Sequence, residues 1–112
     1  MLFFDHKLTE EEIETIKKEF GSYVKITADL GSNRVVVGPI LHADGEKILL
    51  EKGGSQDNIW GGGIDLNDKI IDTMAVLNLR PRLKNDSMEI LDGEKRNKFI
   101  ELVKNIFREL WH

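Results

Sequence analysis

The chain has 112 residues, of which 40% are hydrophobic and 32% are charged, and its formal net charge is −4 at pH 7. This length and composition predict one globular domain over residues 1–112 with a single hydrophobic core. The lack of cysteine excludes a disulfide scaffold, a thiol nucleophile and thiolate metal sites, and the acidic balance argues against a protein that binds duplex nucleic acid.

The N-terminus has only four residues before its first acidic group, too few for the apolar core of a signal peptide. No apolar run in the sequence approaches the roughly 18 residues of a membrane span. We therefore expect a cytoplasmic protein without a membrane partner.

A first helix is expected to start at Thr9, because Thr9 and Glu12 have the spacing of a capping box. Ile13, Ile16 and Phe20 follow at intervals of three and four residues, which places them on one apolar face. This helix is predicted to cover an apolar surface.

Between residues 23 and 80 the period of the apolar residues changes to two and many residues are β-branched, which is typical of strands. Three turn signals interrupt this stretch and predict three hairpins, with turns at 31–33, 43–45 and 67–69. Antiparallel pairing follows, because parallel neighbours need connections of a dozen or more residues. The last strand is expected to run from Ile70 to Arg80.

A closing helix is predicted after Asp92, which can cap its first turn. Its apolar residues recur at three and four over three turns: Phe99, Leu102, Val103, Ile106, Phe107 and Leu110. The predicted fold class is therefore α+β, with a mostly antiparallel sheet of about five strands, a meander of hairpins, and an N-terminal and a C-terminal helix packed on it.

The first candidate for chemistry is the pair His42 and Asp44. If the strand continues to residue 44, both side chains project from the same face, so that the carboxylate can orient the imidazole as a general base requires. The alternative is a solvated histidine beside a turn aspartate. We take His42 and Asp44 as the candidate catalytic residues.

Trp60 is followed by the glycine triplet at 61–63. The triplet is not a phosphate-binding loop, because no Lys-Ser or Lys-Thr pair follows it, and we interpret it as a bulge or a place of close approach. Trp60 then either packs in the core or stacks on a ligand.

A second polar cluster follows the last predicted strand and contains Asn78, Arg80, Asn85 and Ser87. An arginine close to amide and hydroxyl groups can hold a carboxylate or a phosphate with two hydrogen bonds. Together with Trp60, these residues are the candidate ligand-binding residues. The alternative is that Arg80 pairs with an internal carboxylate, for which the sequence offers Glu46, Glu51 and Glu89.

Three blocks of the sequence, LHADGE, GSQDNIWG and NLRP, occur in an order that resembles a family of small prokaryotic proteins known only as a domain of unknown function. The resemblance covers residues 24–107. It implies a compact cytoplasmic protein and no particular reaction. It also raises the expectation that one place unites His42, Asp44, Trp60, Arg80 and Asn85.

Two functions are compatible with these patterns, and whether the protein is an enzyme stays open. The first is binding of a small anionic or nucleotide-like ligand near His42 and Arg80, with hydrolysis as an extension. No cofactor is predicted, and a metal would need Glu46 as a third ligand beside His42 and Asp44.

The second function is a non-catalytic interaction protein that forms a homodimer. It would pair through an edge strand or through the aromatic end of the last helix, at Phe107, Leu110 and Trp111. Nucleic acid ranks third because of the acidic net charge, and its only basic patch is formed by Arg80, Arg82 and Lys84.

Overall fold

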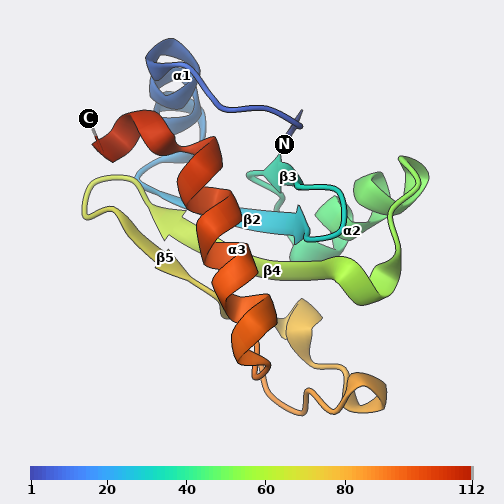
Figure 1. Cartoon of the computed structure of the whole chain (residues 1–112). Helices are drawn as coiled ribbons and strands as arrows, with labels where there is room; N and C mark the ends of the chain where they lie inside the picture. The colour runs from blue at the N-terminus through green and yellow to red at the C-terminus, as the bar shows by residue number, and fades with distance from the viewer. Residues whose placement is uncertain (112) are drawn as a thin grey trace.

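The computed structural model describes residues 1–111 and confirms the α+β class (Figure 1). Its α-helices are α1 (Glu10–Phe20), α2 (His42–Glu51) and α3 (Gly93–Ile106). Its strands are β1 (Leu2–Phe4), β2 (Tyr23–Asp29), β3 (Arg34–Val37), β4 (Ile59–Asp65) and β5 (Ile70–Asp72). They form one sheet in the order β1-β3-β2-β4-β5, and each neighbouring pair is antiparallel.

The two terminal helices are confirmed together with their caps. Thr9 Oγ1 accepts a hydrogen bond from the Glu12 amide at 3.1 Å, and the Glu12 carboxylate accepts one from the Thr9 amide at 2.9 Å. Asp92 accepts from two amides in the first turn of α3. None of the helices within residues 1–111 has both the length and the apolar character needed to cross a bilayer.

Two of the three predicted hairpins are present. β2 and β3 are joined across residues 30–33, and β4 and β5 across residues 66–69. Asn33 and Lys69 have φ angles of 58° and 59°, the left-handed conformation that these tight connections need. The glycine triplet is not a bulge, because each of its residues has a partner in β2.

The third predicted hairpin, at 43–45, is wrong, because this stretch lies inside α2. His42, Gly45 and Leu49 are spaced three and four residues apart and turn toward the sheet, and Gly45 and Leu49 are buried. A Cβ atom at Gly45 would come within 2.6 Å of Thr27 Oγ1, so the glycine permits close helix–sheet packing and does not mark a turn.

The last predicted strand is shorter than expected. Only Ile70–Asp72 joins the sheet, and residues 73–91 form an irregular segment with the 3₁₀ turns η2 (Val76–Asn78) and η3 (Pro81–Leu83). This segment extends away from the sheet at the bottom of Figure 1. The fifth strand is instead β1, which was not predicted and pairs with β3.

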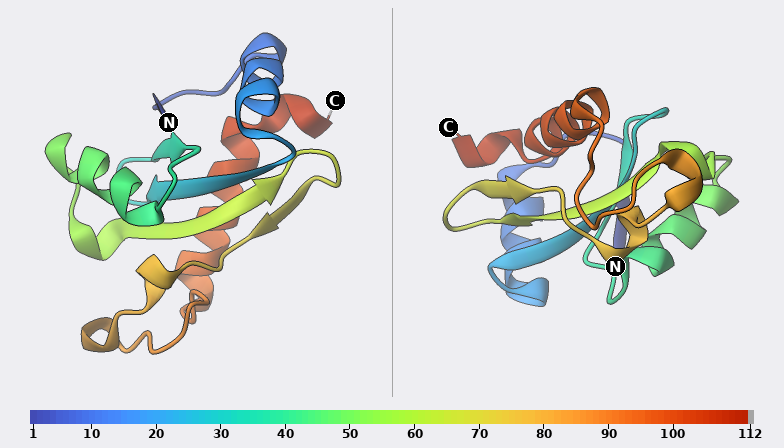
Figure 2. Two further views of the ribbon diagram at one scale, coloured as in Figure 1. Left: turned by 180° about the vertical axis from the view of Figure 1, so that it is seen from behind. Right: turned by 90° about the horizontal axis from the view of Figure 1, so that it is seen from below.

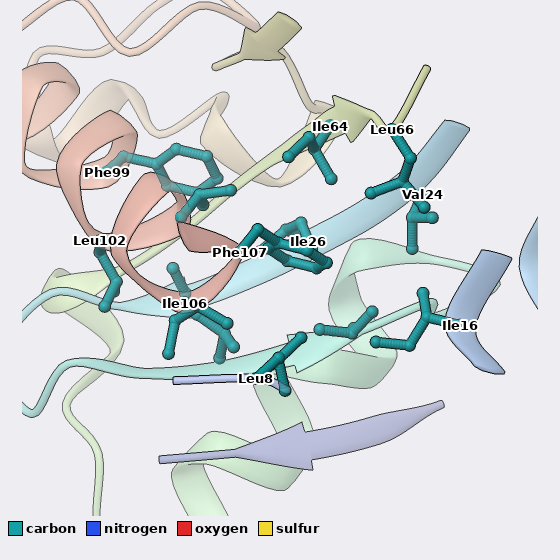
Figure 3. Packing of buried hydrophobic residues seen from close by; sticks show 14 of the residues in the cluster. Leu8, Ile16, Val24, Ile26, Ile64, Leu66, Phe99, Leu102, Ile106 and Phe107 are labelled. Atoms are coloured by element: carbon teal, nitrogen blue, oxygen red, sulfur yellow. The ribbon is translucent and has the colours of Figure 1, made fainter. Parts of the chain in front are cut away.

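Helices α2 and α3 lie on opposite faces of the sheet (Figure 2). The larger apolar cluster unites α1, α3 and one side of the strands, and it includes Phe99 of α3. Figure 3 shows Phe107, the C-cap residue of α3, next to Ile26 of β2. The smaller cluster lies under α2 and has only Val36, Leu49 and Ile59 at its centre. The second face therefore has room for polar groups.

Candidate functional site

His42 is the first residue of α2, and its ring lies against the glycine triplet of β4. Its Nε2 atom is 2.7 Å from the carbonyl oxygen of Gly62, and because a carbonyl only accepts, Nε2 carries the proton and donates. A Cβ atom at Gly61 would lie 2.9 Å from His42 Cδ2. The triplet is thus a place of close approach, and it holds the imidazole on the strand.

The other ring nitrogen of His42, Nδ1, makes no hydrogen bond within residues 1–111. No side-chain nitrogen or oxygen of these residues is both buried and without a hydrogen-bond partner. Nδ1 is therefore not fully buried, and it has a free lone pair when the ring is neutral. Burial lowers the pKa of His42, the charge of Lys25 lowers it further, and the Gly62 carbonyl and Asp72 oppose the shift. The neutral ring is favoured at pH 7, with Nδ1 as a hydrogen-bond acceptor.

A groove of about 480 Å³ opens beside His42, which we call the His42 groove. Its polar residues are Lys25 and His42, and the Lys25 ammonium donates to the carbonyl of Ile40 at 2.9 Å. Its apolar residues come from the start of α2 and from the irregular segment: Leu41, Ala43, Met74, Ala75, Val76, Leu77 and Met88.

Asp44 does not orient His42. Its carboxylate accepts a hydrogen bond from the Leu41 amide at 3.2 Å, so it caps α2. The predicted orientation by Asp44 is wrong, because helix formation turns residues 42 and 44 to different sides, and the Gly62 carbonyl takes the place of the carboxylate.

Arg80 is held inside the protein and does not reach the His42 groove. Its guanidinium lies 2.8 Å from the Glu46 carboxylate and donates to the carbonyls of Gln56 and Ile59 at 2.9 and 2.6 Å. Only 8% of the side chain is exposed. The alternative of an internal pair with Glu46 is confirmed, and this pair ties the irregular segment to α2.

Trp60 also belongs to the interior. It is 1% exposed, its indole N–H donates to the Asp57 carbonyl at 3.0 Å, and the Arg80 guanidinium lies 5.0 Å from its ring centroid. The ring therefore packs in the core, which was the alternative to stacking on a ligand.

Asn78 and Asn85 are buried, and their side-chain hydrogen bonds fix the irregular segment, which does not join the sheet. The Asn78 amide bonds with both backbone groups of Gly61, and the Asn85 amide nitrogen donates to three carbonyls, including that of Ser87. The Ser87 hydroxyl accepts from the amide of Glu89. The Asn85 side-chain oxygen accepts from the Leu91 amide at 2.9 Å, so every polar atom of the two asparagine side chains is engaged internally.

A metal site at His42, Asp44 and Glu46 has no geometric support, since no three His, Asp or Glu side chains of the described chain are grouped to hold an ion. The basic patch is also largely neutralised: Arg80 pairs with Glu46, and Arg82 lies 2.7 Å from the Asp57 carboxylate.

The aromatic end of the last helix is only partly available as an interface. Phe107 is fully buried and Leu110 packs against the core. Trp111 keeps 37% of its surface exposed, and the Lys104 ammonium lies 5.4 Å from its ring centroid. The edges of the sheet are β1 and β5.

The residues that sequence reasoning missed are Lys25 and the apolar walls of the groove, above all Met74, Val76 and Met88. Met74 and Val76 lie in the apolar run MAVLNL, which follows β5 in the sequence, so its composition predicts a longer strand and gives no sign of a groove.

A family model described as a protein of unknown function, DUF5674, matches residues 2–106, and the chain therefore belongs to this family. No curated protein and no solved structure matches the chain.

Proposed function

We propose that this member of the DUF5674 family binds a small, largely apolar molecule in the His42 groove. The observation that carries the proposal is an apolar groove with a single partly buried histidine whose Nδ1 atom is not fully buried. Ligand sites typically combine such apolar walls with a few polar groups that fix orientation.

The exposure of the groove walls supports the proposal. Val76 keeps 73% of its surface exposed, and Leu41, Met74 and Met88 are also among the exposed apolar residues. Exposed apolar groups that share one concave surface favour a ligand, whereas single scattered ones need no explanation. The two methionines add an adaptable surface, since their side chains fit differently shaped partners.

The sequence predicts a ligand near both His42 and Arg80, and this proposal keeps His42 and leaves Arg80 out. Arg80 faces Glu46 and two carbonyl oxygens, so an incoming anion would have to displace an internal carboxylate. If a hydrolytic step accompanied binding, Nδ1 would be the base, since Nε2 is engaged with Gly62.

The test is fluorescence titration with Nile red, a neutral dye that reports on apolar sites. We expect Val76→Asp to weaken dye binding at least about tenfold, because it places a charge in the apolar wall. Ile70→Asp is the matched control, because Ile70 is 61% exposed on β5 and does not line the groove. Equal dye binding by both variants and the unchanged protein would contradict the proposal.

A second candidate function is self-association, and the position of β1 favours it. β1 lies at the end of the sheet with β3 as its one strand neighbour, and all three of its residues are apolar. An open edge of this kind can pair with a second copy. Light scattering at high protein concentration is expected to give twice the mass of the chain, and a strict monomer would remove this candidate.

A further inference from the structure

We propose that the ligand of the His42 groove is a small organic acid, with its apolar body on the methionine side and its carboxylate against His42 and Lys25. The inference rests on the proposed function and adds the chemical class of the ligand. If the groove bound neutral molecules equally well, this inference would be wrong and the proposed function would still stand.

The charge of the groove points to an anion. Lys25 and His42 are the ionisable residues that line it, and no Asp or Glu is among its lining residues. The whole chain carries a net charge of −4, so a wall with only cationic and neutral groups is unusual for this surface. The ammonium of Lys25 has three donors, and one of them is used by Ile40, so the others remain for a ligand.

The hydrogen bond of His42 determines how an acid would bind. Nε2–H is engaged with Gly62, so the ligand meets Nδ1. A carboxylate cannot donate to Nδ1, and two acceptors would face each other unless a proton lies between them. Binding of the carboxylate to the neutral ring therefore takes up one proton from solution, which protonates Nδ1 and leaves a charge-assisted hydrogen bond.

The charged groups around His42 are compatible with this arrangement. The charge of Lys25 on β2 disfavours protonation of His42, whereas the charge of Asp72 on β5 favours it. Asp72 is itself engaged by the Tyr23 hydroxyl and the Met74 amide. On α2, Asp44 accepts from the Leu41 amide and Glu46 pairs with Arg80, and neither lines the groove.

The amino end of α2 also favours a carboxylate in the groove. His42 and Ala43 are its first two residues and both line the groove, so the positive end of the helix dipole lies at the proposed position of the carboxylate. This contribution is secondary to Lys25 and His42, because Asp44 already occupies the cap.

The experiment compares octanoate with octanamide, which have the same chain and differ in charge, by isothermal titration calorimetry. We expect octanoate to bind at least about tenfold more tightly at pH 6, because only the anion engages both cationic groups. Its affinity should fall by about tenfold per pH unit above the pKa of His42, since one proton is taken up. Titrations in two buffers with different ionisation enthalpies measure that proton directly.

Variants then assign the effect to single groups. His42→Gln keeps a donor for Gly62 and should abolish the pH dependence and the proton uptake. Lys25→Met keeps the aliphatic stem and should weaken octanoate without affecting octanamide. Lys47→Met is the matched control, because Lys47 is exposed on α2 and does not line the groove.

The outcomes separate the two proposals. Equal, pH-independent binding of acid and amide, both weakened by Val76→Asp, would overturn the acid and keep the apolar groove. Failure of both compounds and of Nile red would overturn the proposed function itself. Octanoate binding that is insensitive to His42→Gln and to Lys25→Met would overturn the placement of the carboxylate.

Discussion

The two faces of the sheet are stabilised by different means. The face under α1 and α3 has one continuous apolar cluster that includes Ile26, Phe99 and Phe107. The face under α2 has a small apolar cluster, and around it lie buried polar groups such as Asp29, Asn78 and Arg80.

The comparison suggests that stability and recognition are divided between the faces. Apolar cores tolerate hydrophobic substitutions that keep the total volume, whereas buried polar groups are stable only when every hydrogen-bond partner is in place. The α2 face therefore fixes one arrangement of the irregular segment, and with it the walls of the His42 groove. For the same reason, the α2 face is sensitive to the loss of any single hydrogen-bond partner.

The largest expected effect is on the apolar face. Phe99→Ala should lower the free energy of unfolding by about 3–5 kcal/mol, because it leaves a cavity in a fully buried cluster. Urea denaturation measures this difference. Lys98→Ala, at an exposed neighbour whose ion pair with Glu94 is also exposed, should change the free energy by less than about 1 kcal/mol. A small effect of Phe99→Ala would show that this cluster is not the main source of stability.

The second-largest expected loss of stability is on the polar face, at Arg80. Arg80→Met should cost about 3 kcal/mol of unfolding free energy, because Glu46 and two carbonyl oxygens lose their partner inside the protein. The double variant with Glu46→Gln should lose less than the sum of the two single variants in the same denaturation experiment.

Arg82→Met is the control for that cycle. Arg82 and Asp57 form an ion pair of similar length, but both side chains are more than half exposed, so its loss should cost less than about 1 kcal/mol. Equal losses for Arg80→Met and Arg82→Met would contradict a special role of the buried pair.

The smallest expected effect is a pH dependence from His42. Because its pKa is lowered in the folded protein from an ordinary value of 6.5, the unfolded chain binds the proton more readily. The stabilisation is complete above that ordinary value and is lost as the pH falls toward the lowered one. The free energy of unfolding should thus decrease as the pH falls from about 7.5 to about 5.5. His42→Gln should remove this component, and an unchanged slope in that variant would contradict it.

The parts of the fold that sequence reasoning predicted depend on local interactions. The capping box at Thr9 and the cap at Asp92 act within a few residues, and so do the turns at 31–33 and 67–69. The same holds for the α+β class, because helix and strand periods are visible in short windows.

The parts that were missed depend on distant partners. The Asp44-Gly45 pair is a strong hairpin signal by itself, but Gly45 is required because Thr27 of β2 packs against it. Likewise, Asn78 binds the backbone of Gly61 in β4, where a longer β5 would have continued the sheet ladder, so the predicted strand ends early. Neither contact can be read from neighbours in the sequence.

The candidate site shows the same limit. The residue types alone indicate His42 as a candidate and Glu46 as a candidate internal partner of Arg80. The groove itself comes from an apolar run that leaves the sheet, and its position beside Lys25 and α2 is a property of the packing.

The glycine triplet also has a consequence for folding. Glycine has little intrinsic preference for a strand, so residues 61–63 gain little from extending before their neighbours arrive. The space that they leave is filled from both sides, by Phe99 at Gly62 and by His42 and Ala75 at Gly61. Formation of β4 should therefore coincide with docking of both α2 and α3, so that the two faces of the sheet assemble in one cooperative step and not one after the other.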